Sequence, residues 1–394
     1  MIKNDSRHIK SEKDQCSGCG LCTTACINNA ITLEKDEYGF LYPTINNSKC
    51  INCNACVRIC PFTNDYLALQ DGGDVHIAYA FKNTETIRKH SASGGFFSYI
   101  SDYVLKENGV VYGAIFDNKL HVKHDRATTT DERDQMRGSK YIQSNLMSVF
   151  NELIDDIKSD RWILFSGTPC QCAAIKKKID SLNYDKIIYV ELICHGVVSE
   201  QFFEEYISEI NHKYGKRIVS YNFRDKKYGW QTVSGTFDDG TTYYNKNDYF
   251  YPVYSMHVVQ RPSCYKCVYA NNKRISDFTI GDFWGADSKY PEIYDKFGIS
   301  LVLVNTKKGR VFLDQMQKAE LDGVFYPLTE ELYLEKQPNL NRPTPLGPRY
   351  VFFWKYFNKL GYKKTMKRFF EPTLQRRINT RLAHVLHSLG IKKL

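Results

Sequence analysis

Eight of the thirteen cysteines stand in two runs near the start of this 394-residue chain, and the two runs share one spacing. The runs are Cys16, Cys19, Cys22, Cys26 and Cys50, Cys53, Cys56, Cys60. Residues 1–70 hold too few apolar side chains for a hydrophobic core of their own, so bound metal must hold this unit together. Between the runs we expect a short β-hairpin at Ala30–Leu41.

The spacing Cys-x2-Cys-x2-Cys-x3-Cys is that of the bacterial two-cluster [4Fe-4S] motif, in which the fourth cysteine of each run binds the other cluster. The first cluster would therefore take Cys16, Cys19, Cys22 and Cys60, and the second would take Cys50, Cys53, Cys56 and Cys26. Zinc, the alternative, is usually bound by paired Cys-x2-Cys units. Pro61 follows the second run, as is usual in this motif, whereas Ile27 stands in place of the usual proline after the first. That proline is not a ligand. Gly18 and Gly20 would let backbone amides approach the sulfurs.

A cytoplasmic location is expected, because the first residues lack the apolar segment of a secretory signal. No apolar run approaches the roughly 18–20 residues that a membrane-spanning helix needs. Thirteen cysteines in that compartment indicate metal or redox chemistry, since structural disulfides are kept reduced there.

The net charge of +10 is concentrated at the C-terminal end. Between Arg349 and Leu394, twelve Lys and Arg oppose one acid, Glu371, so the rest of the chain sums to about −1. Tyr350–Phe370 interleaves aromatic and basic residues, which predicts an amphipathic helix. Its aromatic face would pack on the central domain, or the helix would make peripheral contact with an anionic membrane or bind an acidic partner. We expect no nucleic-acid binding, because no recognition motif accompanies the charge.

The middle of the chain alternates predicted strands and helices, which indicates an α/β core. The expected elements include a strand at His76–Phe81, a helix at Phe96–Lys106, a strand at Val110–Phe116, a helix at Leu146–Ile157, a strand at Arg161–Phe165, a helix at Cys170–Lys178, a strand at Ile187–Ile193, a helix at Gln201–His212, a strand at Ser300–Asn305 and a helix at Gly309–Gln317. Asp71–Asp74 reads as a linker. We therefore predict an α+β or α/β protein of three parts: a dicluster ferredoxin module at 1–70, a mixed α/β domain at 75–345 and a basic helical tail at 346–394.

The five remaining cysteines are Cys170, Cys172, Cys194, Cys264 and Cys267. Cys170 and Cys194 follow predicted strands, where ligands bind in open α/β sheets, and Cys264-x2-Cys267 is a generic metal half-site. These four would complete a third four-thiolate site, and Cys172 would be left without an assigned role. Alternatively they are inert buried cysteines, or Cys170 is a redox thiol at a helix N-terminus.

Seven segments of the central domain resemble the coenzyme F-420 hydrogenase/dehydrogenase beta-subunit family in their order. They are HSASGGFFSYI (90–100), RGSKYIQS (137–144), FSGTPCQ (165–171), CHGVVS (194–199), FRDKKYGW (223–230), RPSCYKCVY (261–269) and SDFTIGDFWG (276–285). The resemblance implies that the domain at 75–345 is a flavin-binding domain, with FAD beside a third [4Fe-4S] cluster at Cys170, Cys194, Cys264 and Cys267. Family members exchange hydride with a deazaflavin, and others accompany polysaccharide biosynthesis.

The predicted flavin contacts begin with Ser91, Ser93, Gly94 and Gly95, whose amides at a helix start would face phosphate. An ordinary helix N-cap at Ser93 is the alternative. Lys140 would face the flavin or an anionic substrate, although most lysines are solvated surface charges. His195 would donate a proton or hydrogen bond near the cluster, or it is a core histidine. Asp282 is either a turn residue or a ligand contact.

The sequence thus predicts an iron–sulfur flavoprotein oxidoreductase, with no catalytic residue assigned. Its expected partners are ferredoxin or another redox protein and a small-molecule hydride donor or acceptor, which would be deazaflavin, NAD(P)H or a sugar-linked metabolite. The alternative is a non-catalytic electron-carrier subunit of a larger redox complex.

Overall fold

The computed structural model describes residues 12–63, 77–230, 232–245, 248–329 and 333–371. Their strands form a two-stranded hairpin, a three-stranded sheet and an eight-stranded mixed sheet. The strands are β1 (Ile31–Lys35), β2 (Leu41–Ile45), β3 (Ile77–Lys82), β4 (Val110–Phe116), β5 (Val122–Ala127), β6 (Ile163–Gly167), β7 (Ile187–Leu192), β8 (Ile218–Asn222), β9 (Val233–Phe237), β10 (Thr242–Asn245), β11 (Phe278–Asp282), β12 (Ser300–Val304) and β13 (Val324–Leu328).

Helices connect most of these strands. The α-helices are α1 (Leu21–Thr24), α2 (Ala55–Arg58), α4 (Glu85–Lys89), α5 (Phe96–Lys106), α6 (Thr130–Asp134), α7 (Val149–Lys158), α8 (Pro169–Ile179), α9 (Glu200–Tyr214), α10 (Phe250–Ser255), α11 (Ala286–Lys289), α12 (Lys307–Lys318) and α14 (Tyr350–Phe370). The described residues also form the 3₁₀ turns η1 (Lys13–Gln15), η2 (Asp180–Leu182), η3 (Pro262–Lys266) and η4 (Pro338–Leu340).

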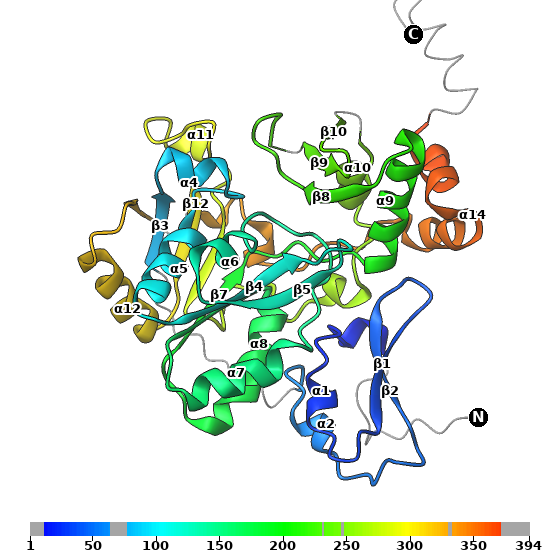
Figure 1. Ribbon diagram of the computed structural model, residues 1–394, viewed down its shortest axis with the longest axis horizontal. Coiled ribbons are helices and arrows are strands. Elements are labelled where there is room, and N and C mark those ends of the chain that lie inside the picture. Colours follow the sequence, from blue (N-terminus) through cyan, green and yellow to red (C-terminus); the bar gives the residue numbers. More distant parts are fainter. Residues whose placement is uncertain (1–11, 64–76, 231, 246–247, 330–332, 372–394) are drawn as a thin grey trace, which may run out of the picture.

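The large sheet has the order β13-β3-β12-β11-β7-β6-β4-β5 (Figure 1). Its four middle strands, β4, β6, β7 and β11, are parallel, and the flanking strands pair antiparallel. Strands β4, β6 and β7 are nearly continuous apolar runs, as expected for parallel strands that helices cover on both faces. The carboxyl ends of parallel strands meet at one edge, where ligands bind in open α/β sheets.

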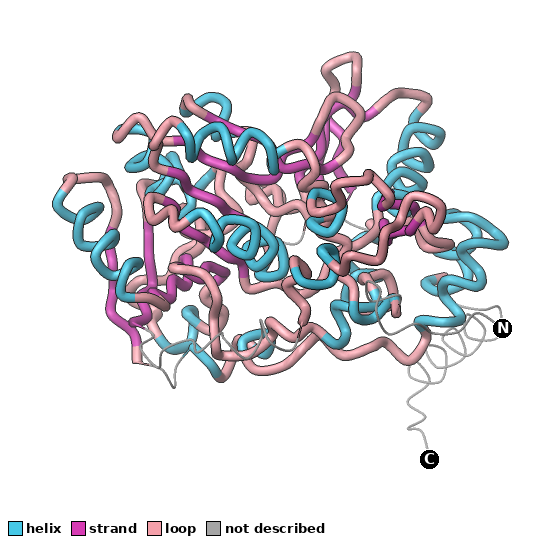
Figure 2. Tube along the Cα trace, turned by 90° about the horizontal axis from the view of Figure 1, so that it is seen from below, coloured by secondary structure: helices cyan, strands magenta, loops and turns pink. Residues whose placement is uncertain are grey.

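Alternate residues of these strands supply two cores. Side chains such as Tyr112 and Phe165 pack against α7 and α8 on one face. Their neighbours, such as Val111 and Leu164, pack against α5 and α12 on the other. Figure 2, turned by 90°, shows helices on both sides of the strands. The predicted α/β core is therefore a three-layer arrangement.

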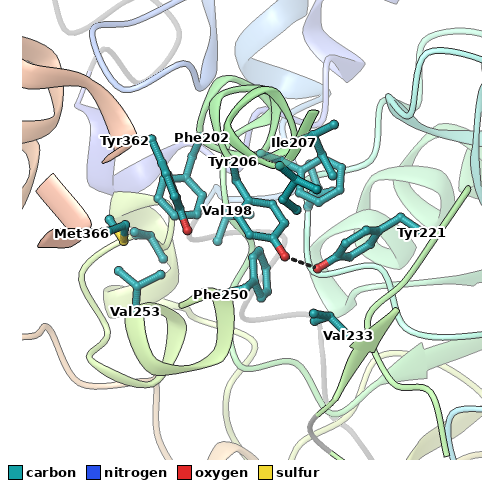
Figure 3. Close-up of a cluster of buried hydrophobic side chains, with 14 of the residues drawn as sticks. Val198, Phe202, Tyr206, Ile207, Tyr221, Val233, Phe250, Val253, Tyr362 and Met366 are labelled. Carbon is teal, nitrogen blue, oxygen red and sulfur yellow. Dashed lines mark hydrogen bonds between the residues drawn. The ribbon is translucent and has the colours of Figure 1, made fainter. Parts of the chain in front are cut away.

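The three-stranded sheet has the order β10-β9-β8, and helix α9 lies between this sheet and the C-terminal helix α14 (Figure 1). Phe202 and Tyr206 of α9 pack against Tyr362 and Met366 of α14, and the hydroxyls of Tyr206 and Tyr221 are 2.8 Å apart (Figure 3). Gly361 interrupts α14 with φ 73°, and the next amide, that of Tyr362, donates to Glu205 of α9 at 3.0 Å. The aromatic face of Tyr350–Phe370 therefore packs on the central domain. The basic residues beyond 371 lie outside the described part.

The cysteine-rich module holds the β1–β2 hairpin, which runs from Ile31 to Ile45, so the expected hairpin at Ala30–Leu41 ends too early. The predicted linker Asp71–Asp74 falls outside the described residues, and the domain boundaries stay predictions. Among the helices that the structure describes, none is long and apolar enough to cross a bilayer.

Candidate electron-transfer site

The eight N-terminal cysteines gather into the two sets that the spacing predicts. One small cavity is lined by Cys16, Cys19, Cys22 and Cys60, called here the first set. A second cavity is lined by Cys26, Cys50, Cys53 and Cys56, called the second set. Cys26 of the first run lines the second cavity, and Cys60 of the second run lines the first cavity. Each run therefore turns around one cavity while its last cysteine points to the other.

The two runs reach the same backbone shape with different residues. Gly18 and Gly20 have φ of 67° and 78°, and Asn52 and Asn54, 34 positions later, have φ of 55° and 58°. Asparagine is one of the few non-glycine residues that visits this left-handed region routinely. The amide of Gly18 lies 3.4 Å from Cys16 Sγ, so the predicted approach of an amide to sulfur is present in the first run.

Four further cysteines form the central set: Cys170, Cys194, Cys264 and Cys267. Cys170 is the second residue of α8, shortly after β6, Cys194 follows β7, and the other two stand in and just after η3. Every pair among these four thiols interacts electrostatically. The structure thus brings together four cysteines that lie up to 97 positions apart in the sequence.

Burial is the main cause of the raised thiol pKa values, to about 12 for Cys22 and Cys267 and about 11 for Cys264. The pKa of Cys170 is also raised, mainly by burial. A reactive thiol needs a lowered pKa, so this finding disfavours Cys170 as a redox thiol. Cys172 is fully buried, and its sulfur contacts the carbonyl of Val190.

No three cysteine sulfurs of the described residues lie within 4.8 Å of one another. Zinc bonds to sulfur at about 2.3 Å, so its ligand sulfurs lie about 4 Å apart. Among the described residues, the one group of three or more ligand atoms within 4.8 Å of one another is His121, Glu200 and Glu204, with no cysteine. The cysteine sets are therefore spread more widely than a single zinc ion requires.

A cavity of about 260 Å³ opens at the carboxyl ends of β6, β7 and β11. It is lined by five of the six predicted flavin residues: Ser91, Ser93, Gly95, Lys140 and His195. Gly94 lies behind the wall instead, where a Cβ would stand 2.2 Å from the carbonyl oxygen of Phe81 and 2.3 Å from the amide nitrogen of Ser300. Cys194 also lines the cavity, so the central set touches it directly.

The hydroxyls of the two predicted serines bind backbone carbonyls of the protein itself. The hydroxyl of Ser91 donates to the carbonyl of Ile87 at 2.8 Å, and that of Ser93 donates to Ile299 at 2.6 Å. Ser93 is therefore not the N-cap of α5; Gly95 holds that position with φ 86°. The first amides of a helix have no partner within it, so they remain available to an anion at this end of α5.

The ammonium of Lys140 binds the backbone carbonyls of the loop at 135–138. Its ammonium donates to the carbonyls of Gln135, Met136, Arg137 and Gly138 at 2.9–3.4 Å. Desolvation lowers its pKa to about 7, while four carbonyl acceptors favour the charged form. This contact shapes the loop that lines the cavity, which sequence spacing could not indicate.

His195 is held as a neutral ring. It stacks on Trp284 with centroids 5.0 Å apart, and burial lowers its pKa to about 4. A neutral imidazole at pH 7 can donate or accept a hydrogen bond in the cavity.

Two arginines that the sequence did not single out, Arg137 and Arg224, also line the cavity, although both lie in the quoted segments. Arg137 has a buried Nη2 without a hydrogen-bond partner among the described residues. Arg224 pairs with Asp282 at 2.5 Å, and the other carboxylate oxygen of Asp282 is buried and unpartnered among those residues. Buried polar atoms without partners are rare in native structures and indicate a missing ligand or water. The residue types in RGSKYIQS and FRDKKYGW do not by themselves indicate that Arg137 and Arg224 face the cavity.

Lys226, also in FRDKKYGW, binds the backbone of the segment whose amides at 91–95 are predicted to face phosphate. Its ammonium donates to the carbonyls of Arg88 at 2.7 Å and Ser93 at 2.9 Å. The aromatic ring of Trp230 lies 5.2 Å away.

Two protein families match this chain, each over one of the regions that hold the cysteine sets. Residues 160–322 match the family described as the C terminus of the coenzyme F420 hydrogenase/dehydrogenase beta subunit, and residues 15–64 match the 4Fe-4S dicluster domain. The chain joins these two domains. The predicted resemblance is thereby confirmed, and the dicluster match supports two [4Fe-4S] clusters in the N-terminal module. The beta-subunit match covers all four cysteines of the central set and His195, whereas Ser91–Gly95 and Lys140 precede it.

Among solved structures, one similar chain comes from a study described as xenon derivatization of the F420-reducing [NiFe] hydrogenase complex from Methanosarcina barkeri. It is 17% identical, with a TM-score of 0.46, over 74% of this chain and 90% of that chain. No curated protein matches this sequence. The two family matches make the chain an iron–sulfur electron-transfer protein related to the F420 hydrogenase beta subunit.

Proposed function

We propose that this chain is an iron–sulfur flavoprotein oxidoreductase that exchanges hydride at FAD in the cavity and single electrons with three [4Fe-4S] clusters. The observation that carries the proposal is the position of Cys194, which belongs to the central set and also to the cavity wall. A flavin at that wall would lie next to a four-thiolate site.

The residues of the chain fit both kinds of bound group, the [4Fe-4S] clusters and the flavin. The first, second and central sets each offer four thiols, too widely spread for a single zinc ion. The cavity offers the amides at the start of α5 and the unpartnered Nη2 of Arg137, both suited to phosphate oxygens. A bound flavin would take up hydride as two electrons and a proton, and the clusters would carry electrons singly.

The three sets follow one another from the cavity outward. Cys170 and Cys267 of the central set pack against the same apolar core as Cys19 and Cys60 of the first set. Cys22 of the first set interacts electrostatically with Cys56 of the second. Electrons would therefore pass between the flavin site and the second set through the central and first sets.

The second set is the outer end of this path. Cys53 is exposed, and the side chains of Ile27 and Ile51 at the same cavity are 81% and 60% exposed. Around them, residues 26–31 and 45–60 contain Lys49 and Arg58 but no acidic residue. We propose this face as the docking site of ferredoxin or a similar small acidic electron carrier, since apolar contact with a cationic rim fits such a partner.

The hydride donor or acceptor would enter at the flavin and be deazaflavin, NAD(P)H or a sugar-linked metabolite of polysaccharide biosynthesis. The neutral ring of His195 and the Arg224–Asp282 pair line the cavity and would contact the reacting part of this molecule. The competing proposal is an electron carrier without flavin.

Anaerobic quantification of iron and flavin on the purified full-length chain separates the two proposals. The oxidoreductase should contain about twelve iron atoms and one flavin per chain. Eight iron atoms without flavin, even after reconstitution with FAD, would overturn it in favour of the carrier. Reduction trials with NADH, NADPH, deazaflavin and reduced ferredoxin would then identify the hydride partner.

A further inference from the structure

Arg261 joins the two domains from a position between the first and central sets. Its Nε donates to the carbonyl of Cys16 at 2.7 Å, and its Nη2 donates to the carbonyl of Leu41 at 2.8 Å. Its Nη1 donates to Gln143 Oε1 at 2.8 Å, and its guanidinium lies 4.2 Å from the ring centre of Tyr42. All of these partners are neutral.

The backbone of Arg261 belongs to the central set. Its amide donates to the carbonyl of Val197, three residues after Cys194, and its own carbonyl accepts from the amide of Cys264. The guanidinium therefore extends from one cysteine set to the backbone of the other, and its charge also acts on the thiols of Cys170 and Cys264.

The charge of Arg261 has no carboxylate partner in the described part of the chain, where four arginines are buried. Arg88, Arg133 and Arg274 each form an ion pair with an aspartate or glutamate. Arg261, only 1% exposed, forms none. Burying an unpaired charge is costly, so a counter-charge is expected beside this guanidinium, and the two thiolate sets are the groups that would provide it.

We infer that Arg261 is a positioning residue whose buried positive charge raises the reduction potential of the cluster in the first set and holds the two domains in register for electron transfer. The inference rests on the proposed function, because the negative charge that it invokes is that of clusters bound by the thiolates. A nearby positive charge favours the reduced, more negative state of a cluster.

The test is an EPR-monitored redox titration of the anaerobically prepared full-length chain. Arg261→Met removes the charge and keeps the length of the side chain. Gln143→Glu keeps Arg261 and instead places a carboxylate against its Nη1. Arg261→Lys retains the charge, and Arg133→Met, which removes a buried arginine of α6 near Asp102, is the matched control.

With Arg261→Met and Gln143→Glu, the reduced-to-oxidised ratio of the first-set cluster at a fixed potential should fall about tenfold, which equals about 59 mV for a one-electron couple. Arg261→Lys should keep most of the potential, and Arg133→Met should leave it unchanged. If Arg261→Met loses iron but Arg261→Lys does not, the charge itself is required, which also supports the inference.

Full iron content with unchanged potentials in both Arg261→Met and Gln143→Glu would overturn the inference. Equal iron loss from Arg261→Met and Arg261→Lys would overturn it as well, since shape and not charge would then be what matters. Failure of the proposed third cluster is seen separately, as eight iron atoms in the unsubstituted chain.

Discussion

The phenol hydroxyl of Tyr269 donates to the carbonyl of Pro61 at 2.6 Å. Pro61 directly follows Cys60 of the first set, and Tyr269 stands two residues after Cys267 of the central set. The ring of Tyr269 also meets Phe62 edge to face, with centroids 5.3 Å apart. The loops that carry the two cysteine sets are thus tied together by one buried hydrogen bond and one ring contact.

Tyr269→Phe should keep the ring contact and lose the hydrogen bond. Because Pro61 is buried, its carbonyl would lose a partner, which costs about 1–3 kcal/mol. We expect the free energy of unfolding of the iron-loaded chain to fall by that amount in denaturant titration, with unchanged iron content. Tyr294→Phe, at a side chain 45% exposed, is the control and should have no effect. Equal stability of the two variants would contradict the role of this bond.

Replacing Cys264 and Cys267 together by serine should remove about four iron atoms per chain and leave the spectra of the N-terminal clusters intact. The reason is that both thiols belong to the central set, away from the two sets of the N-terminal module. Cys172→Ser is the matched control and should retain all the iron, since its sulfur faces the core beside Val190. An unchanged iron count in the double variant would remove the third cluster from the proposal.

The repeat of the cysteine spacing was enough to predict which thiols gather in the N-terminal module, because cluster geometry dictates that spacing. The sequence also predicted helix α5 at Phe96–Lys106 and strand β4 at Val110–Phe116 with the ends that the structure shows. Strand β5 (Val122–Ala127), by contrast, contains four charged or titratable residues in sequence, Lys123, His124, Asp125 and Arg126. Its pattern does not predict a strand for that reason, although tertiary pairing with β4 stabilises it.

The cavity was harder to predict than the cysteines. The glycine and serine segment at 91–95 was found because helix starts have recognisable residues, yet its hydroxyls turned out to serve the backbone. Arg137 and Arg224 were missed because an arginine's side chain gives no local sign of whether it points to solvent or inward. That direction is set by Asp282 and by the loop that Lys140 caps, which are contacts between distant segments.

Arg137→Met should weaken flavin binding while preserving the fold. The unpartnered Nη2 would form a charge-assisted bond to phosphate, worth about 1.5–3 kcal/mol, so the dissociation constant of FAD should rise about tenfold to hundredfold. Flavin fluorescence titration of the flavin-free chain measures this. Arg126→Met, at an arginine paired with Asp156 and absent from the cavity lining, should leave the affinity unchanged. Equal affinities in the two variants would exclude Arg137 as a flavin contact.

Gly94→Ala should destabilise the chain by about 3 kcal/mol or more, because its Cβ would collide with backbone atoms of Phe81 and Ser300 that cannot move without opening the sheet. Gly138→Ala is the comparison. No atom lies within 4 Å of its Cβ position, but its φ of 80° imposes a backbone cost of about 1–2 kcal/mol. Thermal unfolding of the two variants should therefore rank Gly94→Ala as clearly the less stable, and the reverse order would refute the close packing of this segment.

The buried ring of His124 should make stability depend on pH. Its Nε2 lies 2.9 Å from the carbonyl of Ser166, which can only accept, so Nε2 carries the proton and Nδ1 accepts from the hydroxyl of Ser144. Burial lowers the pKa of His124 to about 4. The unfolded chain binds a proton at this residue below about pH 6.5, whereas the folded chain does not. The stability that His124 contributes is therefore complete above that pH and falls as the pH decreases toward 4.

Between pH 6.5 and pH 5 the original chain should lose about 1.5 kcal/mol more unfolding free energy than His124→Gln, which has no titrating group at this position. Denaturant unfolding at the two pH values, under anaerobic conditions, gives this difference. Any effect of acid on the clusters is common to both chains and cancels in the comparison. Equal losses in the two chains would show that His124 becomes protonated within the fold, and the neutral tautomer assigned to it on the cavity wall would then be wrong.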